Sequence, residues 1–180
     1  MLKSISKIIL LIVAFAIACS NVQAIDIPLN NATAQVYFSP HGGDTEAIVK
    51  EIGKAKSEVL VQAYSFTSKD IAKALIDAQK RGIHVEVILD RSNRSAKYSA
   101  ADFTAHMGIP TYIDAEHAIA HNKVMIIDKE TLITGSFNFT KAAEEKNAEN
   151  LLIIKSKGLA KAYLDNWYQH KKHSEVYKGR

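Results

Sequence analysis

The chain of 180 residues contains almost no cysteine and has no strong excess of either charge. Its single cysteine, Cys19, and the lack of Cys and His residues at zinc-ligand spacing exclude a zinc-finger module. The net charge of +4 permits nucleic-acid binding but does not require it. With 47% hydrophobic and 23% charged residues, the composition excludes a disordered or collagen-like chain. One globular domain is therefore expected.

No apolar run reaches the length of about 20 residues that a membrane-spanning helix needs. The run at residues 8–18 has 11 residues and follows the basic Lys3 and Lys7. It precedes Val22-Gln23-Ala24, whose small residues suit a signal peptidase. These three parts predict a secretory signal peptide over residues 1–24. The mature chain, residues 25–180, is expected to be periplasmic or secreted.

Two alternatives to a cleaved signal peptide remain open. A permanent membrane span is the weaker one because the apolar run is short. The other is a lipoprotein with Cys19 as the lipidated residue, although Ala16 stands where such proteins usually have leucine. Cleavage after Ala24 would remove the only cysteine, so the stability of the mature protein would come from its core.

The mature chain alternates between short apolar runs and segments with helical spacing of apolar residues. Strands are expected at residues 34–38, 57–66, 84–89, 111–113, 123–128, 131–135 and 149–155. Helices are expected at residues 45–56, 67–81, 98–106 and 158–170, the second with a capping box of Thr67 and Asp70. This order predicts a one-domain α/β fold. Its sheet should be mixed but largely parallel, with helices on both faces.

Candidate catalytic residues first appear where the strand at residues 123–128 begins. His121 and Lys123 are two residues apart, so along a strand their side chains point to the same face. This pair suits phosphoryl transfer. The imidazole can act as nucleophile or general acid, and the ammonium can hold the negative charge of the phosphate. Asp128 lies seven residues beyond His121 and so on the opposite face. We expect it to organise the turn before Thr131.

Further polar residues follow at the ends of the next two strands. Ser136 and Asn138 share a face and can donate hydrogen bonds to phosphate oxygens, while Gly135 leaves room for close approach. Glu149, at the mouth of a buried strand, needs a partner. His121 is a natural one, because a carboxylate on one ring nitrogen fixes the tautomer. Each residue alone would be an ordinary surface group, but together they indicate a phosphate site.

The pattern His121-x-Lys123-x-x-x-x-Asp128, then Gly135-Ser136-x-Asn138 and Asn147-x-Glu149-Asn150, resembles the phospholipase D superfamily signature. The resemblance covers essentially the whole mature chain and implies a phospholipase D-like fold. The short, exported, single-motif form most resembles the bacterial nonspecific endonuclease branch.

The resemblance implies a mechanism for these residues. One His of the site attacks phosphorus and forms a phosphohistidine, a second His protonates the leaving oxygen, and water releases the phosphate. By resemblance, His121 is the catalytic imidazole, Lys123 and Asn138 bind phosphoryl oxygens with support from Ser136, and Glu149 orients the His. Asp128 joins the catalytic set only as the third residue of the motif. The family implies no metal or other cofactor, and the sequence shows no obvious metal cage.

Family members build one site from two motif copies, and this chain has one. We therefore expect a homodimer whose twofold axis brings both copies of His121 together. The expected substrate is DNA, or also RNA, cut without sequence preference, because no motif for base readout is present. Candidate phosphate contacts are Arg91, Arg94 and Lys97 after one strand and Lys171, Lys172, Lys178 and Arg180 in the tail.

Two other functions remain as alternatives. The same chemistry could act on phospholipid head groups, although no strongly basic amphipathic helix for docking on lipid is evident. A non-catalytic nucleic-acid or envelope-binding module fits less well, because every expected catalytic position is filled. The remaining histidines have no assigned role: His117 is expected to be a plain loop residue, with a place at the site entrance as the alternative, and His170 and His173 belong to the tail.

Overall fold

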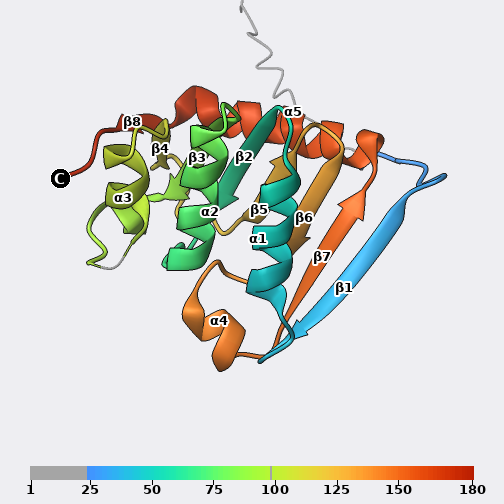
Figure 1. The fold of residues 1–180 in the computed structure, drawn as a ribbon. Coiled ribbons are helices and arrows are strands. Elements are labelled where there is room, and N and C mark those ends of the chain that lie inside the picture. The colour runs from blue at the N-terminus through green and yellow to red at the C-terminus, as the bar shows by residue number, and fades with distance from the viewer. Residues whose placement is uncertain (1–23, 98) are drawn as a thin grey trace, which may run out of the picture.

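The structure is a computed structural model that describes residues 24–97 and 99–180 (Figure 1). Residues 1–23 of the expected signal peptide lie outside the described residues. The expected helix at residues 98–106 begins at Tyr98, which also lies outside them. Within the described part of the chain, no helix is both long and apolar enough to cross a membrane.

Eight strands form one sheet in the order β1-β7-β6-β5-β2-β3-β4-β8. The strands are β1 (Thr33–Ser39), β2 (Glu58–Ala63), β3 (His84–Asp90), β4 (Thr111–Asp114), β5 (Lys123–Ile127), β6 (Thr131–Gly135), β7 (Glu149–Lys155) and β8 (Glu175–Tyr177). The helices are α1 (Asp44–Lys54), α2 (Lys69–Lys80), α3 (Ala101–His106), α4 (Lys141–Glu145) and α5 (Lys157–His173), with a 3₁₀ turn η1 (Arg91–Arg94).

The sheet is mixed, but most of its strand pairs are antiparallel. Only β2 with β3 and β3 with β4 pair in parallel. The other five pairings are antiparallel. The expectation of a largely parallel sheet is therefore wrong. Residues 128–130 alone connect β5 to β6, which is too short for the crossover that parallel strands need, and edge strands β1 and β8 also pair antiparallel.

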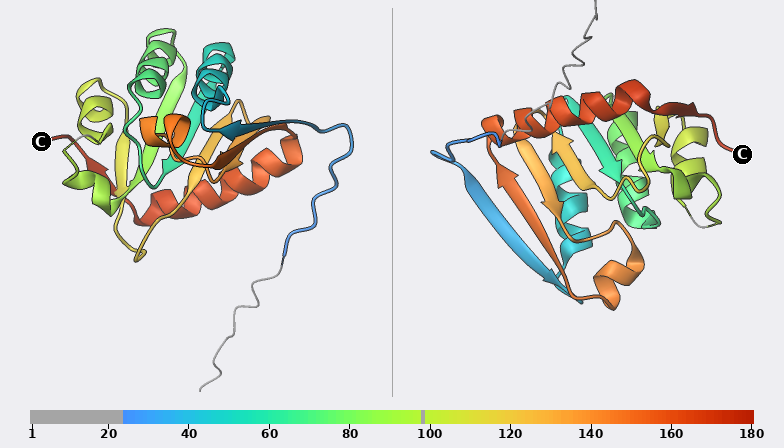
Figure 2. Two further views of the ribbon diagram at one scale, coloured as in Figure 1. Left: turned by 90° about the horizontal axis from the view of Figure 1, so that it is seen from below. Right: turned by 180° about the vertical axis from the view of Figure 1, so that it is seen from behind.

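Helices cover both faces of the sheet, as expected. Helices α1, α2 and α3 lie on one face and α5 runs across the other (Figure 2). Because β2 is covered on both sides, all six of its residues are buried. Val59 and Val61 belong to the core under α1 and α2, whereas Leu60 packs with Trp167 of α5. The indole nitrogen of Trp167 also donates to the Val61 carbonyl at 3.0 Å, which fixes α5 on the sheet.

Some element ends differ from the expectation. The N-cap of α2 is Ser68, whose hydroxyl accepts from the Ile71 amide, so the predicted cap at Thr67 is wrong by one residue. Strand β2 ends at Ala63 and not at residue 66. Helix α4 and strand β8 were not expected, because five and three residues are too few for a periodic pattern.

The topology brings the ends of several strands to one edge of the sheet. In register, Ala63 of β2 lies between Leu89 of β3 and Lys123 of β5. On the other side, Gly135 of β6 lies beside Leu151 of β7. The last residues of β2, β3 and β6 therefore meet the first residues of β5 and β7, at the edge where α4 lies in Figure 1. All the predicted site residues except Asp128 belong to this edge.

Candidate active site

His121 and Lys123 both lie next to the ring of Tyr64. The His121 ring lies 4.6 Å from the Tyr64 ring, centroid to centroid, and the Lys123 ammonium lies 5.2 Å from the same ring centroid. The backbone holds this arrangement, because the Tyr64 amide donates to the Asn122 carbonyl at 2.7 Å. The predicted shared face of His121 and Lys123 is thus seen in the structure.

Lys123 carries a charge that is buried and available for an anion. Its side chain is 7% exposed, and its ammonium donates to the His121 carbonyl at 2.9 Å. Among the described residues, no carboxylate lies within ion-pair distance of it. Burial lowers the pKa of Lys123, and the nearby negative charge of Glu149 partly opposes that shift. A cation held in this way is stabilised further by a bound phosphate.

Ser136 and Asn138 project from a segment that two buried rings anchor. Phe137 and Phe139 are fully buried, and Phe139 forms a bridge with Phe66 after β2. This alternation leaves Ser136 exposed and Asn138 half-buried. The Oδ1 atom of Asn138 is buried and, within the described part of the chain, has no hydrogen-bond partner. Such an atom requires an explanation, and a substrate or a second chain at the site would supply one.

The Ser136 hydroxyl has a partner within the chain. It accepts from the Asn150 backbone amide at 3.0 Å and from the Asn150 side-chain amide at 3.2 Å. Its own proton is free for a phosphate oxygen. Gly135 is needed at this place because its φ is 145° and an added Cβ would lie 2.3 Å from the Asn150 carbonyl oxygen. Gly135 therefore permits a close approach between the backbones of β6 and β7.

Glu149 lies at the start of β7 and does not contact His121 within the described chain. Its carboxylate accepts from the Asn147 side-chain amide at 3.0 Å. The expected His121–Glu149 hydrogen bond is thus not formed in the single chain. Glu149 still acts on the site through its charge, which raises the pKa of Lys123 against the effect of burial.

A second carboxyl group, that of Asp44, lies buried near Glu149 at the start of α1. Asp44 is fully buried, and neither of its carboxyl oxygens has a hydrogen-bond partner among the described residues. Burial, together with the charges of Glu144 and Glu149, raises the pKa of Asp44. A protonated Asp44 would add no negative charge to a site that binds phosphate. No pattern in the sequence indicated a role for Asp44.

Asp128 lies at the other end of β5 and takes no part in the site. Its carboxylate accepts hydrogen bonds from the backbone amides of Lys56, Ser57 and Glu58 and from the Ser57 hydroxyl. Burial would raise the pKa of Asp128, but these four donors outweigh it and lower the pKa. The Asp128 carboxylate therefore organises the start of β2 and the segment before it, and not the turn before Thr131 as expected, and it has no hydrogen bond to His121 or Lys123 among the described residues.

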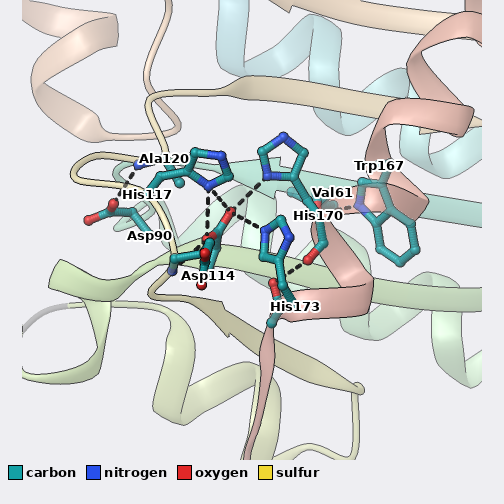
Figure 3. Close-up of polar contacts among 10 residues, drawn as sticks. Val61, Asp90, Asp114, His117, Ala120, Trp167, His170 and His173 are labelled. Atoms are coloured by element: carbon teal, nitrogen blue, oxygen red, sulfur yellow. Dashed lines mark hydrogen bonds and ion pairs between the residues drawn. The ribbon is translucent and has the colours of Figure 1, made fainter. Parts of the chain in front are cut away.

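Two positioning residues of the site were missed in the sequence. Tyr64 lies next to His121 and Lys123. In the sequence, only its place directly after a buried strand could have indicated this role. Asp90, at the end of β3, accepts from the Ala120 amide at 2.8 Å and from the Ser92 amide at 2.9 Å. Its buried carboxylate therefore holds the segment that leads to His121 (Figure 3).

Several of the basic residues proposed to contact phosphates are engaged in ion pairs. Arg91 is exposed and directly follows β3 at the edge of the site. Three others are paired with acids: Arg94 with Glu175, Lys171 with Glu86, and Arg180 with Asp102. Those pairs weaken the case for the tail as a nucleic-acid surface and favour Arg91.

No cluster of metal ligands involves these site residues within the described part of the chain. One group of four residues that could hold a metal lies apart from the site, around Asp114 at the end of β4. It contains three histidines to which the sequence analysis gave no role.

Comparison with known proteins agrees with the fold and the motif. The family described as "Cardiolipin synthase, PLD-like domain" matches residues 48–171. The chain is 41% identical over 165 residues to a protein of Rickettsia typhi named "Phospholipase D", covering 91% of this chain and 81% of that protein.

Solved structures show the same architecture. The crystal structure of a phospholipase D family member, Nuc from Salmonella typhimurium, matches with a TM-score of 0.79 and 39% identity, covering 82% of this chain and 99% of that one. NucT from Helicobacter pylori matches with a TM-score of 0.74 and 24% identity, covering 81% of this chain and 99% of that one, and shares the fold. The expected fold class is confirmed.

Proposed function

The chain belongs to the phospholipase D superfamily and is a phosphodiesterase of that family, and from this premise we propose that it is a nonspecific endonuclease. Its substrate is DNA, with RNA as a second polynucleotide substrate. The observation that carries the proposal is the exposed His121 beside the buried Lys123, which no carboxylate of the described chain neutralises. That pair offers a nucleophile and an anion site at one point.

The proposed reaction has two displacements at phosphorus. A nitrogen of His121 attacks, a P–N bond forms, and the bond to the leaving oxygen breaks as a second imidazole donates a proton to that oxygen. Water then breaks the P–N bond and leaves a phosphate monoester at the cut end. Lys123 and the Asn138 amide bind the non-bridging oxygens, where charge accumulates.

We propose that the second imidazole is His121 of another copy of this chain. A single chain carries one such histidine, and a twofold axis through the site would supply the other. Two large apolar side chains next to the site support self-association: Phe38, opposite Asn150 in the sheet, is 65% exposed, and Ile119 is 58% exposed. The unpartnered oxygen of Asn138 also fits a site that one chain leaves incomplete.

A nucleic-acid substrate fits the exposed arginine at the edge of the site. Arg91 is exposed there without an ion pair among the described residues, and it can contact a phosphate next to the cleaved one. Contacts of this kind release counterions, so activity should fall as salt rises.

Phospholipid is the second candidate substrate, because the Rickettsia typhi relative is named "Phospholipase D". The exposed Ile119, two residues before His121, would then touch the lipid surface. On this alternative the two displacements at phosphorus are unchanged, and the two groups esterified to the phosphate differ.

Plasmid cleavage by the purified chain tests the proposal, with His121→Ala beside it and phosphatidylcholine vesicles assayed in parallel. The nuclease proposal expects nicking and linearisation that the variant lacks, and no choline release. Choline release without DNA cleavage would select the phospholipid alternative, and neither activity would overturn both. Sedimentation of the active protein tests the dimer, and a fully active monomer would exclude the composite site.

We also propose that the chain is exported and cleaved after Ala24, which leaves residues 25–180 as the mature protein. N-terminal sequencing of the exported protein tests this. A lipid-modified Cys19 at the N-terminus would select the lipoprotein alternative.

A further inference from the structure

Four side chains converge outside the candidate active site, at the contact between strand β4 and helix α5. They are Asp114 at the end of β4, His117 in the loop that follows, and His170 and His173 in the last turns of α5 (Figure 3). We propose that these four residues bind a divalent transition-metal ion of the zinc class. The reaction proposed for His121 and Lys123 does not use these four residues.

The four groups already point at one place. Asp114 Oδ2 lies 2.7 Å from His170 Nδ1, 3.1 Å from His117 Nδ1 and 3.3 Å from His173 Nε2. One ligand atom from each residue lies within 4.8 Å of all the others. A tetrahedral zinc site with bonds of about 2.0–2.1 Å places its ligand atoms about 3.3 Å apart. Small side-chain rotations would therefore bring the four atoms into coordination distance.

The donor set selects the class of metal. Three imidazoles and one carboxylate suit Zn²⁺, Co²⁺, Ni²⁺ or Cu²⁺, whereas Mg²⁺ and Ca²⁺ prefer sets made of oxygen only. The Asp114 carboxylate is fully buried and lies within hydrogen-bond distance of all three imidazoles, so it supplies the oxygen ligand of the set.

Three imidazole rings surround a single carboxylate. The three ring centroids lie 4.9–5.3 Å from one another, and the carboxylate of Asp114 is fully buried. One metal ion bound by a nitrogen of each ring and by Asp114 would satisfy all four groups together.

Regular structure holds three of the four ligands in place. Asp114 closes a strand, and His170 and His173 are three residues apart on one face of α5. The Glu116 amide donates to Asp114 Oδ1 at 3.2 Å, which orients the carboxylate so that its Oδ2 atom lies within hydrogen-bond distance of all three histidines. These supports distinguish the cluster from a chance meeting of exposed side chains.

A metal ion bound by these four residues would influence the position of His121 through the loop that connects it to His117. His117 lies four residues before His121, in the loop whose Ala120 amide is held by Asp90. An ion that ties His117 to α5 would fix the other end of that loop. The ion is therefore structural: it positions His121 without touching the substrate.

Metal binding by the untagged chain tests the proposal directly and needs no substrate. The protein is stripped with a chelator, dialysed and titrated with Zn²⁺ by calorimetry, and then with Co²⁺ by visible absorption. We expect one ion per chain, a rise in Tm on binding, and the intense d–d bands of tetrahedral Co²⁺.

Two variants complete the test. His170→Gln with His173→Gln should lower the affinity for Zn²⁺ by at least about 100-fold and remove the Co²⁺ bands. His84→Gln, at an exposed histidine on β3 outside the cluster, should bind as the native chain does. Unchanged binding in the double variant, or no binding and no Co²⁺ bands in the native chain, would overturn the proposal. The measurements on the native chain need no variant, so they test the proposal even if the double variant misfolds. They also use no substrate, so their result is independent of the nuclease proposal.

Discussion

The two ends of strand β5 carry motif residues with opposite environments. At the start of the strand, Lys123 is buried with its charge uncompensated by any carboxylate of the described chain, and His121 is exposed. At the end, Asp128 accepts four hydrogen bonds from the start of β2 and the segment before it. At one end, this motif of eight residues holds a buried charge that an anionic ligand can stabilise. At the other end, it holds a carboxylate whose hydrogen bonds are already satisfied.

This difference separates chemistry from architecture within the motif. A polar group whose hydrogen bonds are all satisfied gains nothing from a substrate, and its loss costs folding free energy. A buried charge without a partner costs folding free energy and gains when an anion arrives. Substitutions at the first end should therefore change catalysis, and those at the second should change stability.

His121→Ala should give the largest change. We expect kcat to fall by about 10³-fold or more, because the variant lacks both the nucleophile and the proton donor of the site. The free energy of unfolding should change by less than about 1 kcal/mol, since the side chain is exposed. Steady-state cleavage and urea denaturation measure the two quantities. His84→Ala, at an exposed histidine on β3, is the matched control and should keep its activity.

Lys123→Met should lower kcat by about 10²- to 10³-fold, because it removes charge stabilisation at the phosphate but keeps the length of the side chain. It should not destabilise the fold, because the buried ammonium makes no ion pair among the described residues. Lys50→Met, at an exposed lysine of α1, is the control. A marked loss of stability with little loss of activity would show that Lys123 is structural, like Asp128.

Gly135→Ala and Gly53→Ala should have opposite effects on stability. The first introduces a Cβ at φ 145° that would lie 2.3 Å from the Asn150 carbonyl oxygen, and should lower the free energy of unfolding by about 2–3 kcal/mol. The second lies inside α1 with open space around it and should raise that free energy by about 0.5–1 kcal/mol. Because Gly135 sets the path into Ser136, only the first should also lower kcat. Thermal or urea unfolding with parallel assays measures both.

Asp128→Asn should have the smallest effect on catalysis, with kcat close to that of the native chain. It should lower the free energy of unfolding at pH 7 by about 2 kcal/mol, because a neutral amide replaces an ionised acceptor of four hydrogen bonds. The pKa of Asp128 is lowered in the fold, so its stabilisation is present above about pH 4 and is lost as the pH falls through the folded value. The difference from the native chain should therefore shrink in acid. A constant difference across that range would contradict the role given to the charge.

The sequence was informative where local periodicity or a motif carried the signal. It predicted β6 and β7 with correct bounds and the shared face of His121 and Lys123. It also placed Asp128 away from His121, because the strand alternation separates the two residues.

The errors arose where tertiary contacts decide the outcome. The antiparallel pairing of β5 with β6 could have been predicted from the two residues between the expected strands, whereas the pairing of edge strand β1 with β7 depends on tertiary contacts that no periodicity reveals. The Glu149 side chain bonds Asn147, two residues away in the chain, and not His121, which precedes β5 on the other side of β6. The histidine cluster joins Asp114 to His170, 56 residues apart in the chain. Only the packing of α5 on the sheet brings them together.

The stereochemical course at phosphorus tests the central claim most directly. A short DNA containing one phosphorothioate of known configuration is cleaved in ¹⁸O-labelled water, and the configuration of the product is determined. Two successive displacements through His121 predict overall retention. Inversion would mean that water attacks the phosphodiester directly, and would contradict the phosphohistidine mechanism built on His121 and Lys123.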